Sequence, residues 1–300
     1  MPPLILLLSL ACCAQPAPPA VVPPSATPPS EAPAAPKPLP LAGLPVGSFH
    51  PLEPGLELGH FASPVPSTLG DSRITVLRVD PQLFSVEVLS ASREHPDTIM
   101  PGPGWAARHD LVAVINAGMF GMDYRTATFA LIDQGHDNNG TIATKAGSAL
   151  LLEPTDAGLP SARLLDLRCD DIQSLRPSYT SLVQSYRLLT CAGTPAWQRS
   201  HMIWSHALVG SDQRGHILFI HARSPWSTRQ ITEILLALPL DLQHLHYAEG
   251  GPEATLYLRH GERELLQVGS YETGFNENDH NKHAWEIPNV IAVRRKPTSR

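Results

Sequence analysis

Apolar and polar residues alternate along several short segments of the chain. Between residues 84 and 89, Phe and Val alternate with Ser and Glu, and residues 254–259 show the same period of two. This period is typical of a half-buried β-strand. Residues 74–79 form another apolar-rich segment, which the turn-forming residues 80–82 join to residues 84–89. The two segments are therefore predicted to pair as a hairpin.

Other apolar segments are continuous or bounded by turn residues, and they predict further strands. Residues 111–115 are all apolar, which indicates a strand buried on both faces or a core segment. A hairpin turning at His260 and Gly261 is predicted to follow residues 254–259. The remaining predicted strands are residues 149–152, 163–167, 215–221 and 289–293.

One segment carries a strong helix signal. Ser227 is an expected N-cap, and Gln230 stands at the position that completes a capping box. The apolar face after it consists of Ile231, Ile234, Leu235 and Leu238, and Pro239 ends the helix. A shorter helix is predicted for residues 98–109. Because strands outnumber helices and helices interrupt them irregularly, we expect an α+β fold with a mixed, mainly antiparallel sheet core. Residues 51–300 are predicted to form it as a single domain.

The first fifty residues differ in composition from the rest of the chain. Residues 1–14 contain the apolar run Leu4–Leu10, which is shorter than the roughly 20 residues that span a bilayer. The run is typical of a secretory leader, and it resembles a bacterial lipoprotein signal with Cys12 as the lipidated residue and Cys13 as the alternative. Residues 15–50 are rich in Pro and Ala and predict a disordered linker. We therefore expect an exported protein, anchored to a membrane through a lipid or located in the periplasm or outside the cell.

The net charge argues against one class of partner, and the cysteines predict a covalent link within the chain. The formal net charge is −6 at pH 7, so nucleic acid is not an expected partner, because nucleic-acid binding usually leaves a basic footprint. In an exported protein, Cys169 and Cys191 predict a disulfide, and a pair of buried free thiols is the alternative.

Polar residues follow apolar strands at three places, which are the candidate sites. The first is the segment 116–125, which contains two glycines, an aspartate and an arginine; the second is the segment 184–187. The third is the segment 249–253, where Gly-Gly-Pro lies between two glutamates. Glycines allow the backbone to turn tightly or to approach a ligand closely. The structural alternatives are a turn with a solvated Asp–Arg pair, a surface arginine and a β-bulge with solvated glutamates.

Residues 274–283 contain several potential metal ligands, among them Asp279 and two histidines. Oxygen-rich loops suit calcium and paired histidines suit zinc, but the spacing of an EF-hand and the His-Glu-x-x-His motif do not occur. A polar loop at the rim of a site is the favoured interpretation. No metal or other cofactor is expected, and a divalent metal remains the alternative.

Taken in order along the chain, the segments 115–120, 184–188 and 248–254 resemble the phosphodiester glycosidase family, and in particular its bacterial exported branch. The family includes N-acetylglucosamine-1-phosphodiester α-N-acetylglucosaminidases. The resemblance runs from Arg73 to Arg295. The enzyme members typically carry Asp-Gly-Gly-Gly-Ser where this chain has Glu-Gly-Gly-Pro-Glu. Pro252 removes a backbone donor that a third glycine would offer to a phosphate.

The resemblance implies hydrolysis of a sugar-1-phosphodiester of envelope or polysaccharide-related glycan. A carboxylate then stabilises or attacks an oxocarbenium-like centre, and Glu249 is expected as nucleophile or as base for water. Arg187 is expected to hold the phosphate and Asn116 to orient a sugar hydroxyl or the phosphate. The other residues expected at the site are Asp123 as a further catalytic residue, Gly118, Arg125, Gln184, Gly250, Gly251, Glu253 and Asn276 as substrate contacts, and Asp279 at the rim.

Two other functions stay open at this point. A non-catalytic lipoprotein of the same fold could bind envelope polysaccharide, and the change at Pro252 and Glu253 would then mark lost catalysis. A metal-dependent phosphodiesterase that cuts P–O bonds is the third possibility.

Overall fold

The structure is a computed structural model that describes residues 37–94 and 99–297. These residues belong to one compact unit that begins at Pro36. The expected leader 1–14, the lipidation residue Cys12 and the linker as far as residue 36 lie outside the described residues. No helix within the described ranges is long and apolar enough to cross a membrane.

Strands dominate the described chain, with 46% of residues in strands and 13% in helices, so the fold is mainly β. The first sheet runs in the order β1 (Lys37–Pro38), β16 (Arg263–Val268), β15 (Thr255–His260), β6 (Ala113–Asn116), β17 (Asn289–Arg295) and β5 (Phe84–Ser90). The second runs β10 (Ala162–Asp166), β9 (Gly147–Pro154), β11 (Tyr179–Tyr186), β7 (Leu131–Asp133) and β8 (His136–Asn139). The third runs β14 (Leu242–Gly250), β12 (Trp204–Asp212), β13 (Ile217–Trp226), β4 (Arg73–Val79), β3 (Leu56–Ala62) and β2 (Phe49–Glu53). Apart from the parallel contact of β1 with β16, the paired strands of these sheets are antiparallel, as expected.

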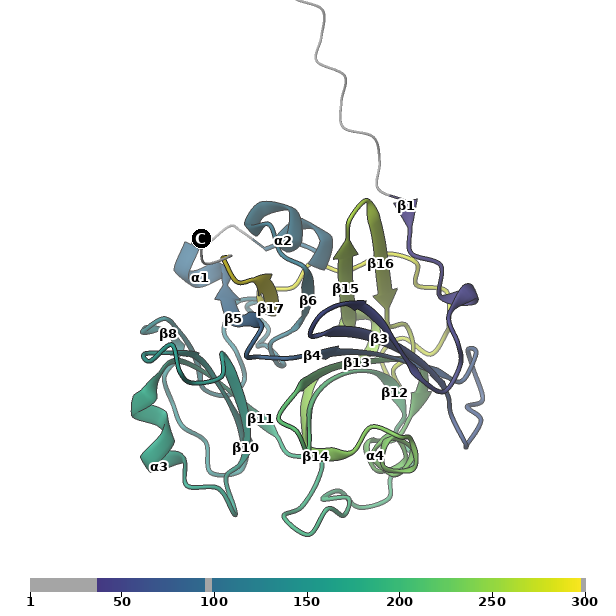
Figure 1. The fold of residues 1–300 in the computed structure, drawn as a ribbon. Helices are drawn as coiled ribbons and strands as arrows, with labels where there is room; N and C mark the ends of the chain where they lie inside the picture. The colour runs from purple at the N-terminus through teal and green to yellow at the C-terminus, as the bar shows by residue number, and fades with distance from the viewer. Residues whose placement is uncertain (1–36, 95–98, 298–300) are drawn as a thin grey trace, which may run out of the picture. The chain divides into compact units, whose positions relative to one another are not determined.

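The helices are few and short. They are α1 (Ala91–Glu94), α2 (Gly102–His109), α3 (Ile172–Leu175) and α4 (Thr228–Ala237), with single 3₁₀ turns η1 (Leu41–Gly43), η2 (Arg176–Ser178) and η3 (Gly251–Glu253). The predicted capping box of α4 is confirmed, because Ser227 Oγ accepts from Gln230 N and Gln230 Oε1 accepts from Ser227 N at 3.1 Å. Helix α4 packs against β12–β14 on the side away from β15 and β16 (Figure 1).

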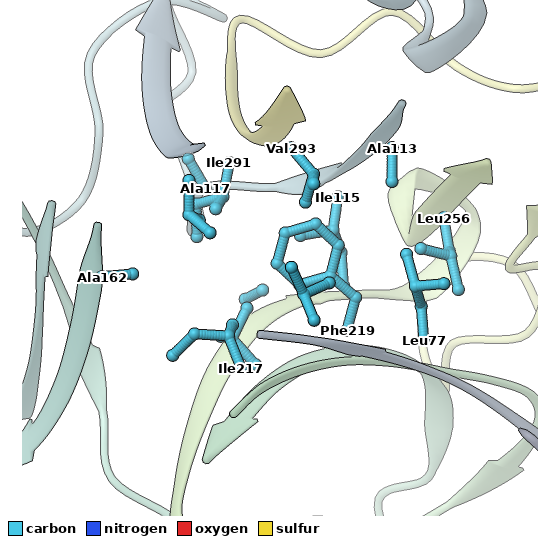
Figure 2. Close-up of a cluster of buried hydrophobic side chains, with 14 of the residues drawn as sticks. Leu77, Ala113, Ile115, Ala117, Ala162, Ile217, Phe219, Leu256, Ile291 and Val293 are labelled. Carbon is cyan, nitrogen blue, oxygen red and sulfur yellow. The ribbon is translucent and has the colours of Figure 1, made fainter. Parts of the chain in front are cut away.

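The main core lies where the first and third sheets face each other, with side chains of the second sheet closing one side. Figure 2 shows Phe219 of β13 packed beside Ile115 of β6, with Leu77 of β4 and Leu256 of β15 close by. All four side chains are fully buried. Because apolar burial gives each such side chain roughly 1.5–3 kcal/mol, this core fixes the strands that carry the candidate site.

Three expectations about local structure are wrong. Strands β4 and β5 do not form a hairpin, since β4 pairs with β3 and β13 in the third sheet and β5 pairs with β17 in the first. Strand β15 is not half-buried, because α2 covers its second face and Thr255 to Leu258 are all buried. Residues 37–50 are not part of a disordered linker, because Leu39, Leu41 and Leu44 pack on the main core.

Candidate active site

The end of β14, the turn η3 and two loops meet at a cleft of about 410 Å³. The two loops are residues 117–130, which follow β6, and residues 269–288, which follow β16. The lining residues are Met119, Phe120, Gly121, Met122, Tyr124, Thr128, Tyr247, Glu249, Gly250, Glu253, Glu272 and Phe275. The cleft is therefore lined by three carboxyl side chains together with aromatic and Met side chains.

The elbow at Gly250 and Gly251 brings these carboxylates together. A β-bulge between β12 and β14 lies directly before Glu249, and such irregularities often re-aim a side chain next to a site. Gly251 has φ of +64°, which favours glycine, and a Cβ there would overlap Glu272 Oε2. A Cβ at Gly250 would overlap the Tyr247 hydroxyl. Both glycines are thus required by close packing, and Glu272 lies directly on the elbow.

The three glutamates of the cleft all have raised pKa values. Burial, together with the nearby carboxylates of Glu253 and Glu272, raises the pKa of Glu249 to about 8, although its carboxylate accepts the Gly250 N–H at 3.0 Å. Burial, with a contribution from Glu272, raises the pKa of Glu253 to about 7. Burial also raises the pKa of Glu272. Crowded carboxyl groups in a partly desolvated cleft resist ionisation, so at neutral pH Glu249 is mainly protonated.

Tyr247 completes the floor of the cleft. Its ring is buried against the imidazole of His206, with the ring centroids 6.3 Å apart. Burial raises the pKa of Tyr247 well above its usual value, and the charges of Glu249 and Glu272 add to this. The hydroxyl therefore stays neutral at any physiological pH.

Asn116 supports the elbow from behind and does not line the cleft. Its side chain is buried, with Nδ2 donating to Glu253 O at 3.0 Å and Oδ1 accepting from Thr255 N at 2.8 Å. The two bonds join the end of β6 to η3 and to the start of β15. The described contacts of the Asn116 side chain are thus with the elbow, and its expected contact with substrate stays a prediction.

Arg187 lies away from the cleft, so the expected convergence of Arg187 with Glu249 is not found. Its Nη1 contacts both carboxylate oxygens of the buried Asp166, at 2.8 and 3.0 Å. Cys191 Sγ also lies 3.5 Å from Asp166, and Cys191 is joined to Cys169 by a disulfide. Arg187 therefore fastens the segment after β11 to this disulfide-linked region.

The other residues expected near Asn116 shape the loop that forms one wall of the cleft. Asp123 is exposed and accepts from Arg125 N, Thr126 N and Thr126 Oγ1, which together lower its pKa. Gln184 is buried, and its Oε1 accepts from Ala143 N at 2.8 Å. Gly118 has φ of +132°, which turns the backbone at the start of this loop. Asp123, Gln184 and Gly118 are not among the described residues that line the cleft, so their expected part in the site stays a prediction.

Asn276 and Asp279 belong to the second loop, where each contacts other groups of the protein. Asn276 Nδ2 donates to Ser270 O at 2.7 Å, and Asp279 forms an ion pair with Arg223 at 2.7 Å. Within residues 37–94 and 99–297, the one group of His, Cys, Asp and Glu side chains close enough to share a metal is Asp166, Cys169 and Cys191. The sulfurs of that group are bonded to each other, so they are not available as metal ligands.

Sequence reasoning missed Glu272 and Tyr247, which both line the cleft. Glu272 lies in an irregular loop, and no periodicity distinguishes it from the exposed glutamates nearby. One signal was available, because the family resemblance extends over residues 269–275. A carboxylate inside that stretch was a reasonable candidate.

Comparison with known proteins shows which family the sequence matches and which solved structures have a similar fold. The sequence model of the phosphodiester glycosidase family matches residues 109–294. The fold is similar to that of the catalytic domain of zebrafish N-acetylglucosamine-1-phosphodiester α-N-acetylglucosaminidase, auto-inhibited by its pro-peptide, with 17% identity, a TM-score of 0.56, and 83% of this chain and 87% of that one covered. It is also similar to a hypothetical protein from Synechocystis, with 12% identity, a TM-score of 0.57, and 85% and 65% of the two chains covered. No functionally curated protein matches the chain. The family match spans more than half of the sequence, and the chain therefore belongs to the phosphodiester glycosidase family.

Proposed function

We propose that this chain is a glycoside hydrolase that cleaves a sugar-1-phosphodiester in the cleft at Gly250 and Gly251. The observation that carries the proposal is the group of three carboxyl side chains, Glu249, Glu253 and Glu272, in one cleft of a chain of this family. Glycosidases commonly need two carboxyl groups in different protonation states, one as acid and one as nucleophile or base. The raised pKa values of these glutamates favour such a division.

In this proposal Glu249 is the acid. Its pKa of about 8 keeps it protonated at neutral pH, so it donates to the phosphate oxygen as the bond from that oxygen to the anomeric carbon breaks. This role replaces the expected role of Glu249 as nucleophile or base, because either of those roles needs an ionised carboxylate. Glu272, whose pKa is raised by burial alone, is the carboxylate that faces the oxocarbenium-like centre. Water adds to the anomeric carbon and gives its proton to the Glu249 carboxylate that the first step left ionised, and the products are the free sugar and a phosphomonoester.

The charged residues of the cleft support a protonated carboxyl group, rather than a cationic side chain, as the group that contacts the phosphate. No Lys, Arg or His is among the described residues that line the cleft. A neutral carboxyl group can donate a hydrogen bond to a phosphate oxygen, whereas an ionised one can only accept. Binding of an anionic substrate therefore favours the protonated form of Glu249.

The test is hydrolysis of an aryl N-acetylglucosamine-1-phosphodiester by the full chain, followed through the released sugar. We expect Glu249→Gln and Glu272→Gln each to lower kcat/KM by about 10²–10⁴-fold. Glu286→Gln is the matched control, because Glu286 is an exposed glutamate outside the cleft and its loss should leave turnover unchanged. Unchanged turnover in Glu249→Gln would contradict the assignment of Glu249 as the catalytic acid.

A polysaccharide-binding protein without catalysis is the second candidate. It is favoured by Pro252, which offers no backbone N–H to a phosphate. The same assay separates the two functions. Binding of sugar-1-phosphodiesters without release of any sugar by the wild-type chain supports the binding protein.

We also propose that the chain is exported and lipidated at Cys12, which would bring the domain to a membrane surface. The supporting observations are the apolar run Leu4–Leu10 and the disulfide between Cys169 and Cys191, which is typical of oxidising compartments. Labelling of cells with a palmitate analogue tests the anchor. Label on wild type that is lost in Cys12→Ser is the expected result, and unlabelled wild-type protein would contradict it.

A further inference from the structure

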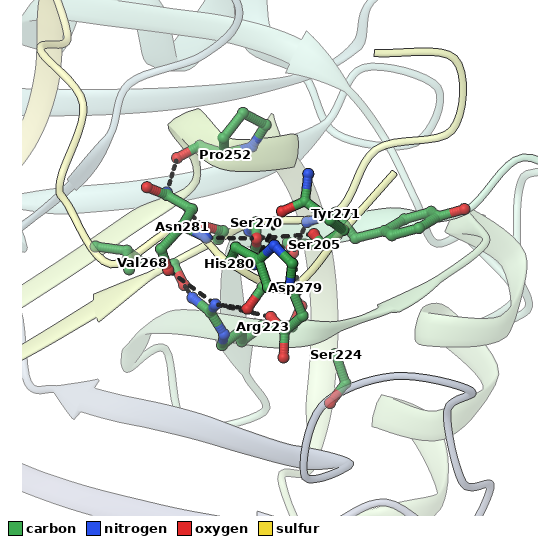
Figure 3. Close-up of polar contacts among 12 residues, drawn as sticks. Ser205, Arg223, Ser224, Pro252, Val268, Ser270, Tyr271, Asp279, His280 and Asn281 are labelled. Carbon is green, nitrogen blue, oxygen red and sulfur yellow. Dashed lines mark hydrogen bonds and ion pairs between the residues drawn. The ribbon is translucent and has the colours of Figure 1, made fainter. Parts of the chain in front are cut away.

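Arg223 lies on β13, outside the cleft lining, and contacts both ends of the loop of residues 269–280. Its Nη1 donates to Val268 O at 2.9 Å, where β16 ends. Its Nη2 donates to Asp279 O at 3.0 Å and to Asn281 O at 2.8 Å, and it forms an ion pair with Asp279 Oδ1 at 2.7 Å. Figure 3 shows the guanidinium between these two parts of the loop. One side chain thus closes the loop at its base.

The main chain of Arg223 holds the start of the same loop through a neighbouring strand. Its carbonyl accepts from Ser205 Oγ at 2.6 Å, and Ser205 Oγ accepts from Ser270 N at 2.9 Å and Tyr271 N at 3.2 Å. Ser205 lies on β12, which pairs with both β13 and β14. The loop is therefore attached to the same strands that position Glu249.

The base of this loop also contacts the glycine elbow directly. Asn281 Nδ2 donates to Gly269 O at 2.8 Å and lies 3.4 Å from Pro252 O. Gly269 N donates to Ala254 O at 2.7 Å, and a Cβ at Gly269 would overlap Gly251 O. Such close packing leaves little freedom for the loop to shift against the elbow.

We infer that Arg223 is a positioning residue of the cleft, which fixes the loop 269–280 so that Glu272 stays against Gly251 and beside Glu249. The inference rests on the proposed function, because it concerns how that site is held in shape. A guanidinium suits this task, since its planar fork serves several acceptors at once and stays charged at any physiological pH. Arg223 contacts no reacting group and acts through Glu272.

The charge state of Glu249 provides a readout for this role. The titratable groups that face Glu249 are Glu253 from η3, Glu272 from the loop, and Tyr247 on its own strand. His206 of β12 lies opposite Gly250, and it stays neutral because burial lowers its pKa to about 4. If the loop loosens, Glu272 moves away and water reaches the cleft. Both changes lower the pKa of Glu249.

The experiment uses the full chain labelled with ¹³C at the glutamate carboxyl carbons, titrated by NMR. Glu249→Gln assigns the Glu249 resonance. In Arg223→Gln we expect Glu249 to titrate at lower pH than in wild type, and kcat to fall by about 10–100-fold with a smaller change in KM. Arg223→Lys keeps the charge but loses the fork, so it should give an intermediate result. Arg259→Gln, which removes an arginine paired with the exposed Asp110, is the matched control and should titrate as wild type.

The inference is overturned if Glu249 titrates in both Arg223 variants at the same pH as in wild type. If activity also falls in those variants while the titration is unchanged, Arg223 contributes to stability only. If Arg223→Gln does not fold, the titration of Glu249 in Arg223→Lys alone tests the inference. If wild type turns over no sugar phosphodiester, the proposed function fails, but the titration still decides whether Arg223 positions Glu272.

Discussion

Replacement of Gly251 by alanine tests the central geometry of the site. At φ of +64° an L-residue is strained by roughly 1–2 kcal/mol, and the added Cβ would also overlap Glu272 Oε2. Overpacking of this kind typically costs about 1–3 kcal/mol more. Because Glu272 must move, Gly251→Ala should lose both stability and activity.

Gly261→Ala is the matched control for the backbone strain. Gly261 has a similar φ of +60° in the turn between β15 and β16, and no atom lies within 4 Å of a Cβ built there. The difference in unfolding free energy between the two variants, measured by urea denaturation of the full chain, therefore isolates the clash. We expect Gly251→Ala to be less stable by about 1–3 kcal/mol, and most of that difference to disappear when both glycine changes are made in a Glu272→Ala background.

Equal destabilisation by the two glycine substitutions would refute this reasoning. It would mean that the Glu272 carboxylate does not lie on the elbow in solution. The hydrolysis assay gives an independent check, since Gly261→Ala leaves the cleft intact and should keep wild-type turnover.

Three further predictions concern pH, the disulfide and the helix cap. The pKa of Glu249 is raised from 4.5 to about 8 in the folded state, so the folded protein binds this proton more tightly than the unfolded chain and loses stability as pH rises between those values. Glu249→Gln should therefore gain stability relative to wild type as the pH rises from 5 to 9, and parallel thermal denaturation curves would contradict this. Reduction of the Cys169–Cys191 disulfide, which links residues 22 positions apart, should cost about 3 kcal/mol in urea denaturation, and Cys191→Ser, already lacking the bond, should not respond to reductant. Ser227→Ala should destabilise the protein by about 1 kcal/mol and Ser227→Gly by only a few tenths, and equal losses would argue against the side-chain cap.

The residues that sequence reasoning placed correctly are those whose structure depends on near neighbours. The capping box at Ser227 and Gln230 is one example, since its partners are three positions apart. The hairpin at Gly261 is another, because the turn and the two strands follow each other directly. The elbow at residues 249–253 was predicted as a candidate site because paired glycines allow the backbone to turn tightly or to approach a ligand closely.

The errors arose where long-range contacts decide the outcome. Strands β4 and β5 follow each other as the strands of a hairpin would, yet each pairs with other strands in a different sheet. Arg187 was expected at the phosphate because a lone arginine after an amide suits an anion. A buried carboxylate, Asp166, takes that role instead. A sequence pattern does not show which charged group will be brought within reach of another.

By itself, the sequence determined the strand-rich composition, the positions of most strands and helices, and the family, because these depend on local periodicity and on ordered motifs. Only the tertiary structure decided which carboxylates share the cleft. Glu249 and Glu272 are separated along the chain, and they meet because Gly251 admits the second carboxylate and Arg223 fastens its loop. Their raised pKa values follow from that meeting, since burial and mutual repulsion arise only after the chain has folded.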